Sequence, residues 1–114
     1  MAMREPTFFI LTALAGPPLH GYGVMQAVRE LSGGRLVLRA GTLYAALDRL
    51  LEEGLLSVER EEVTDGRLRR YYRLTESGSS ALREEVDLMR ANAALAAARL
   101  RRAGVPNVAY LGIA

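Results

Sequence analysis

The chain has 114 residues, half of them hydrophobic and a quarter charged, which predicts one folded domain rather than a disordered segment. It contains no cysteine, which excludes disulfides and thiolate metal sites, and its net charge is only +2. No apolar run approaches the ~20 residues of a membrane span and no signal peptide is evident, so we expect a cytoplasmic protein that does not bind a membrane.

The first third of the chain predicts two helices. Pro6 is placed to begin the first, "TFFILTALAG", which ends near Gly16 and is apolar on all sides, as expected of a buried helix. "YGVMQAVREL" predicts the second helix, which ends at a pair of glycines, residues 33–34. The β-prone segment "RLVL", residues 35–38, predicts a short first strand.

A third helix is predicted from Gly41 to Glu53. Its leucines share one face, while three other side chains point the opposite way: Thr42, Ala45 and Arg49. "LLSVERE" and "LRRYYRL" follow as two strands around "VTDG", whose Asp-Gly pair favours a hairpin turn. Alternation places Tyr72 and Leu74 on one face of the second strand and Arg69, Tyr71 and Arg73 on the other.

Thr75 is placed to cap a fourth helix over residues 76–102. At ~1.5 Å per residue this helix spans about 40 Å, whereas a compact 100-residue domain has a radius of gyration near 13 Å. One end should therefore overhang, with an apolar stripe that a second copy of the chain would cover: Leu82, Val86, Met89, Ala93, Ala96 and Leu100. The alternative is a helix that folds back onto its own domain after a break near Asn92.

The residues do not favour an enzyme. His20 is the only histidine, and no serine has an obvious base partner in the sequence. The position of His20 just before a helix predicts a capping or turn role. No catalytic residue and no cofactor is expected.

A DNA-binding domain agrees better with the element order. Two helices joined by a connector and followed by a β-hairpin predict a mostly α, α+β winged helix-turn-helix fold. Residues 67–73 carry four arginines and no acid, so the wing is expected to contact phosphates or the minor groove. The alternative, a merely solvated hairpin, would leave these four charges unpaired.

Three stretches resemble the PadR family of bacterial transcriptional regulators: "LTALAGPPLHGYGVMQAV", "GTLYAALDRLLEEGLL" and "GRLRRYYRLTESG". The resemblance covers about residues 8–83. The single long C-terminal helix is similar to that of the small PadR subfamily. This resemblance implies a homodimer that binds a palindromic operator in double-stranded DNA and usually represses transcription.

Carried onto this chain, the resemblance places Thr42 and Tyr44 of "GTLY" on a recognition helix facing DNA. It places the wing contact at three arginines: Arg67, Arg69 and Arg70. Where the family often has Ser-Pro before "GT", this chain has Arg39-Ala40, and Arg39 is a candidate phosphate contact. Ala45 replaces a common proline and is small enough to meet a thymine methyl. With Arg49, these residues form the candidate DNA-binding set.

The resemblance also raises a small aromatic, drug-like effector, which some small PadR proteins stack on a tryptophan of the last helix. Met89 stands at that position and can line an apolar pocket but cannot form an aromatic sandwich. We expect a DNA-binding domain over residues 1–75, a dimerisation helix over 76–104 and a tail over 105–114. A winged-helix protein-interaction module without DNA binding is the alternative, favoured by the five acids of residues 50–62.

Overall fold

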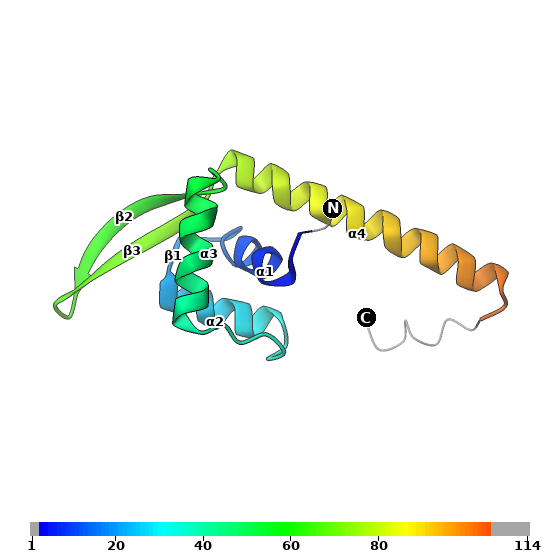
Figure 1. The fold of residues 1–114 in the computed structure, drawn as a ribbon, viewed down its shortest axis with the longest axis horizontal. Coiled ribbons are helices and arrows are strands. Elements are labelled where there is room, and N and C mark those ends of the chain that lie inside the picture. The colour runs from blue at the N-terminus through cyan, green and yellow to red at the C-terminus, as the bar shows by residue number, and fades with distance from the viewer. Residues whose placement is uncertain (1–2, 106–114) are drawn as a thin grey trace. The chain divides into compact units, whose positions relative to one another are not determined.

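The computed structural model describes residues 3–105, which form four helices and a three-stranded antiparallel sheet (Figure 1). In chain order the elements are α1 (Glu5–Ala13), β1 (Leu19–His20), α2 (Gly21–Leu31), α3 (Ala40–Glu52), β2 (Leu56–Thr64), β3 (Arg67–Leu74) and α4 (Glu76–Arg102). The α+β class and the winged-helix order are confirmed. The chain divides into two compact units at Arg83 and Glu84, inside α4. Of the predicted tail, all but Val105 lies outside the described residues.

The hydrophobic core lies among the first three helices and the sheet. Helices α2 and α3 each turn one apolar face inward, whereas every residue of α1 except Glu5 is buried or half-buried. The side chains at most 1% exposed are Ile10, Leu11, Leu14, Val24, Val28, Leu43, Leu47 and Leu50. Three leucines of α3 are completely buried, as their spacing predicts. The opposite face of α3, with Thr42 and Ala45, therefore remains exposed.

The sheet has the strand order β1-β3-β2. Strand β1 pairs through Leu19 with Tyr72 and through His20 with Tyr71. Strands β2 and β3 form a long hairpin that extends away from the first three helices (Figure 1). Its two-residue turn has positive φ at Asp65 (52°) and Gly66 (74°), the type I′ geometry that an Asp-Gly pair favours.

A bulge at Glu59 sets the charge pairing of this hairpin. Val58 pairs with Tyr72 but Arg60 pairs with Tyr71, so one extra residue is accommodated in β2. If Glu59 instead paired regularly with Tyr71, Arg60 would stand opposite Arg70. With the bulge, Glu61 stands opposite Arg70, and the two side chains form an ion pair of 3.0 Å.

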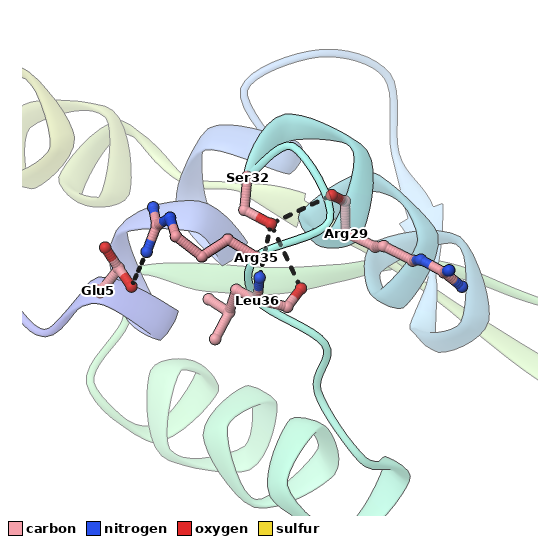
Figure 2. A network of polar contacts seen from close by, with 5 residues as sticks. All are labelled: Glu5, Arg29, Ser32, Arg35 and Leu36. Carbon is pink, nitrogen blue, oxygen red and sulfur yellow. Dashed lines mark hydrogen bonds and ion pairs between the residues drawn. The ribbon is translucent and has the colours of Figure 1, made fainter.

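The predicted strand over residues 35–38 is wrong. This segment is an irregular connector between α2 and α3. Two of its three apolar residues are there for burial rather than strand pairing, because Leu38 is 6% exposed and Leu36 packs against the core, while Val37 is exposed. The Leu36 N–H donates to Ser32 Oγ (2.9 Å), and the Arg35 guanidinium donates to Glu5 Oε1 (2.7 Å), as Figure 2 shows. These contacts tie the connector that leads into α3 to the ends of α2 and α1.

Helix α4 begins and ends as its sequence predicts. The Thr75 hydroxyl accepts from the Gly78 N–H (3.0 Å) and donates to the Gly54 carbonyl (2.7 Å), so it both caps α4 and holds the chain that precedes β2. The helix continues through Asn92 to Arg102 without a break, and Gly104 follows with a φ of 75°.

Candidate nucleic-acid interface

The N-terminal half of α3 presents the first group of candidate residues to solvent. Arg39 occupies the N-cap position, and Arg39, Thr42 and Ala45 are all exposed. Tyr44 is 45% exposed. These four residues therefore share one accessible end of a helix that the core holds along its other face.

Arg49 lies apart from this group. It is seven residues beyond Thr42, about 10 Å along the helix axis. Its guanidinium donates to Thr7 Oγ1 in α1 (2.8 Å) and pairs with Glu53 (3.3 Å). The structure thus gives Arg49 intramolecular partners at the C-terminal end of α3, where it braces α3 against α1.

The four arginines of β3 are not equivalent. Arg67 is exposed and pairs in register with Thr64 next to the turn. Arg70 forms the ion pair with Glu61, and Arg73 donates to the Leu74 carbonyl (3.3 Å). The premise that a solvated hairpin would leave four unpaired charges is therefore wrong for Arg70, because the acidic strand β2 supplies it with a carboxylate.

Arg69 contacts His20 instead. The Arg69 Nη1 lies 3.0 Å from His20 Nε2, and within residues 3–105 this is the only hydrogen-bonding contact of the Arg69 guanidinium. The His20 Nδ1 accepts from the Gly23 N–H (3.0 Å), so the predicted capping role of His20 in α2 is confirmed. The contact with Arg69 joins residues 49 positions apart and has no local signal in the sequence.

Aromatic contacts extend this cluster across the sheet. The His20 ring stacks on Tyr71, with centroids 5.3 Å apart and planes at 20°, and the Arg60 guanidinium lies 4.0 Å from the centroid of the Tyr71 ring. Tyr22, 62% exposed, approaches His20 edge-on. One residue from each strand therefore takes part in the stack: His20 in β1, Tyr71 in β3 and Arg60 in β2.

Tyr44 connects this cluster with α3. Its phenol ring lies against Gly21 so closely that a β-carbon at Gly21 would collide with the Tyr44 hydroxyl. Because Gly21 directly follows His20, the exposed end of α3, the first turn of α2 and the base of the wing form one continuous surface. Tyr72 lies beneath it, only 2% exposed, and its burial raises the pKa of its hydroxyl, although the charge of Arg70 opposes the shift.

The candidate dimerisation residues of α4 fall into two environments. Leu82 packs against the core of its own unit and Val86 is half-buried. Met89 is 48% exposed and Leu100 44%, and Ala93 and Ala96 are also exposed. Leu88 and Leu95, which the sequence places beside this stripe, are exposed as well. From residue 88 onward, the large apolar side chains of α4 are therefore exposed to solvent.

The described residues were also compared with what a membrane-spanning helix and a metal site require. None of the helices within residues 3–105 has the length and apolar content needed to cross a membrane. Over the same residues, no group of three or more His, Cys, Asp or Glu side chains is arranged to hold a metal ion.

Comparison with known proteins identifies the family. Residues 10–84 match the model of the "Transcriptional regulator PadR-like family". The chain is 43% identical over 76 residues to "Transcriptional regulator Rv3488" of Mycobacterium tuberculosis, an alignment that covers 67% of each protein.

Solved structures agree with this match. A PadR family regulator from Clostridium difficile superposes with a TM-score of 0.72 at 25% identity, over 85% of this chain and 99% of that one. Bacillus subtilis PadR in complex with operator DNA superposes with a TM-score of 0.66 at 25% identity, over 73% of this chain and 48% of that one. This chain thus covers about half of the length of the Bacillus protein. The chain belongs to the PadR-like family of transcriptional regulators.

Proposed function

We propose that this chain is a homodimeric transcriptional repressor that binds a palindromic operator through α3 and the hairpin wing. The single observation that carries the proposal is the continuous surface on which the exposed end of α3 adjoins the arginine-bearing hairpin. A helix with one buried and one exposed face suits the major groove, and an arginine-rich hairpin beside it suits the adjacent backbone or minor groove. The operator complex of Bacillus subtilis PadR supports the same use of this fold.

In the proposed complex Thr42, Tyr44 and Ala45 meet base edges, since their side chains are short or planar and stand on the exposed face of α3. Arg39, Arg67, Arg69 and Arg70 meet phosphates. Arg70 must exchange Glu61 for a phosphate oxygen to do so, whereas Arg67 is exposed at the tip. We therefore assign Arg67 the most direct wing contact. We assign Arg49 no contact with DNA, because Thr7 and Glu53 hold its guanidinium.

The proposed dimer uses α4. Val86, Met89, Ala93, Ala96 and Leu100 recur at alternating intervals of three and four residues, which is the spacing of a coiled-coil seam. A two-fold axis through such a seam would present two copies of α3 to two half-sites, and this relates the dimer to a palindromic operator.

The most specific part of the proposal is release from DNA by a small aromatic, drug-like effector. It rests on Met89, an adaptable apolar side chain in the seam that is 48% exposed. Several planar cationic compounds should be added to a preformed protein–DNA complex. Unchanged binding across all of them would remove the effector from the proposal and leave the repressor.

The test of DNA binding is a titration of a labelled duplex from upstream of the chain's own gene, followed by fluorescence anisotropy at several salt concentrations. A scrambled duplex is the control for sequence preference. We expect tighter binding to the upstream duplex and an affinity that falls steeply with salt, because each neutralised phosphate contributes about −0.9 to the logarithmic salt slope. Salt-insensitive or absent binding to both duplexes would instead support a protein-interaction module.

Arg67→Ala tests the wing directly. It should weaken binding to both duplexes and reduce the magnitude of the salt slope by about one. Arg29→Ala is the matched control, because Arg29 is exposed in the last turn of α2, at the other end of that helix from His20. Equal effects of the two substitutions would show that the wing has no special role.

A further inference from the structure

The two neighbours of the His20 ring, the Gly23 N–H and the Arg69 guanidinium, are both hydrogen-bond donors, and the neutral ring can accept from only one of them. The His20 Nδ1 accepts the Gly23 N–H, so Nδ1 carries no hydrogen. An imidazole with an unprotonated Nδ1 carries its single hydrogen on Nε2. Nε2 is therefore a donor, yet it lies 3.0 Å from Arg69 Nη1, which can only donate.

The other tautomer does not remove the conflict. With the hydrogen on Nδ1, His20 Nε2 would accept from Arg69, but the Nδ1–H would then face the Gly23 N–H and α2 would lose its cap. Two donors would again meet, now at the start of a helix whose first N–H groups need acceptors. The stack on Tyr71 holds the ring in place, so His20 satisfies one of its two neighbours and not both.

A third group with an acceptor oxygen resolves this conflict. An oxygen that receives hydrogen bonds from both His20 Nε2–H and Arg69 would leave the cap of α2 intact and give the guanidinium an anionic partner. The neighbouring carboxylates are already engaged, since Glu61 binds Arg70 and Glu62 binds Arg60. The acceptor must therefore come from outside the described residues.

The position of the pair indicates which anion this is. His20 directly precedes Gly21, against which Tyr44 of α3 packs, and Arg69 lies in β3 of the wing. The pair thus lies between the helix proposed for the major groove and the hairpin proposed for the adjacent groove. In duplex DNA these two grooves are separated by one sugar-phosphate backbone.

We propose that His20 Nε2–H and the Arg69 guanidinium together bind one phosphate of the DNA backbone, on the strand between the two grooves. The proposal rests on the proposed function and adds to it a residue that the helix-capping role alone does not place at the DNA. In this arrangement His20 has two functions: Nδ1 caps α2, and Nε2 orients the protein on its operator. The stack with Tyr71 and Arg60 keeps the ring in the orientation that serves both.

The tautomer is tested first, without DNA. His20 is the only histidine of the chain, so untagged protein labelled with ¹⁵N-histidine gives a single pair of ring-nitrogen resonances. We expect the Nε2–H tautomer in the neutral ring and a shift of Nε2 when the upstream duplex is added. An Nδ1–H tautomer would overturn the proposal.

His20→Asn then separates the two functions. Asparagine is a good N-cap, so α2 and the thermal stability should be retained, but its side chain is too short to supply the Nε2–H. We expect about tenfold weaker binding to upstream and scrambled duplexes alike, the size of a lost hydrogen bond to a charged group. In an Arg69→Ala background the same change should cost much less, because the shared phosphate contact is already broken.

Neutral methylphosphonate linkages, introduced one at a time into the upstream duplex, locate the phosphate. Wild-type protein should lose affinity at one linkage in each half-site, where His20→Asn loses none. If wild type and His20→Asn bind the duplexes with equal affinity, and no linkage distinguishes them, the phosphate contact of His20 and Arg69 is overturned and the proposed function stands. Wild-type protein that binds no duplex would overturn the proposed function itself, and the tautomer result would then be the remaining test of the donor conflict.

Discussion

Gly78 in the first turn of α4 lies directly against the backbone carbonyl of Leu55, so closely that a β-carbon at Gly78 would collide with the carbonyl oxygen. The contact fixes the start of α4 beside the beginning of β2. It is reinforced by Thr75, whose N–H also donates to the Leu55 carbonyl (3.1 Å).

Gly78→Ala should therefore destabilise the domain, by about 2 kcal/mol or more, because a backbone carbonyl cannot move aside as a side chain can. Gly41→Ala is the matched control, since Gly41 is also helical but has open space around its Cα. There the gain in helix propensity should stabilise by about 0.5–1 kcal/mol. Urea denaturation measures the change in the free energy of unfolding for both variants. A Gly78→Ala protein as stable as wild type would show that the contact between Gly78 and the Leu55 carbonyl is not rigid.

Thr42→Ala and Arg39→Ala should affect DNA binding in different ways. If Thr42 meets a base edge, its loss changes the order of preference among single-base variants of the upstream duplex, by about 1 kcal/mol at one position. If Arg39 meets a phosphate, its loss weakens binding to all variants about equally. Competition titrations across the set of variants distinguish these patterns. A uniform loss for Thr42→Ala would remove it from the residues assigned to base recognition.

Met89→Glu should weaken the proposed dimer, because it places a charge in the apolar seam of α4. Ala91→Glu introduces the same charge at an exposed position of the same helix outside the heptad stripe, and should leave assembly unchanged. Sedimentation equilibrium over a range of protein concentrations measures both. A wild-type monomer, or equal dissociation of the two variants, would contradict the assignment of the seam.

Tyr72 predicts a dependence of stability on alkaline pH. Burial raises the pKa of its hydroxyl in the folded state, while the unfolded chain ionises near the ordinary value of about 10. The unfolded state therefore loses this proton first as the pH rises. The stabilisation is complete below about pH 10 and is lost as the pH rises through the higher pKa of the folded state.

Urea denaturation at about pH 9 and about pH 11 should show a steeper loss of stability for wild type than for Tyr72→Phe, whose side chain cannot ionise. Tyr22→Phe is the control, because Tyr22 is 62% exposed. Its stability should follow the wild-type curve. Parallel curves for wild type and Tyr72→Phe would show that burial does not govern this ionisation.

The features predictable from the sequence are those set by nearby residues. The faces of α3, the type I′ turn at Asp65 and Gly66, the Thr75 cap and the bounds of α4 each follow from residues within a few positions of one another. Helix periodicity, turn chemistry and capping are local effects, so one sequence suffices to predict them.

The features that were missed depend on pairing between distant segments. Strand β1 has two residues and exists only because it pairs with β3, so no periodicity could show it, and the apolar residues 35–38 suggested a strand in the wrong place. The Arg69–His20 contact depends on that same pairing. The Arg70–Glu61 ion pair depends on the bulge at Glu59, which the sequence does not mark with a glycine or proline.

The bulge also makes the wing sensitive to where its chain length changes. Deletion of Glu59 alone would leave Arg60 opposite Tyr71 and Glu61 opposite Arg70, because pairing then runs without interruption past this point. Deletion of Val63 would keep every charge of the hairpin, but with the turn and the pairing of Val58 with Tyr72 retained it would place Glu59 against Tyr71 and Arg60 against Arg70. The Arg60 guanidinium would then leave the Tyr71 ring and face a like charge. In this hairpin, the loss of one apolar residue between the bulge and the turn is therefore a more severe lesion than the loss of the charged residue in the bulge, because it changes the partner of every charge in between.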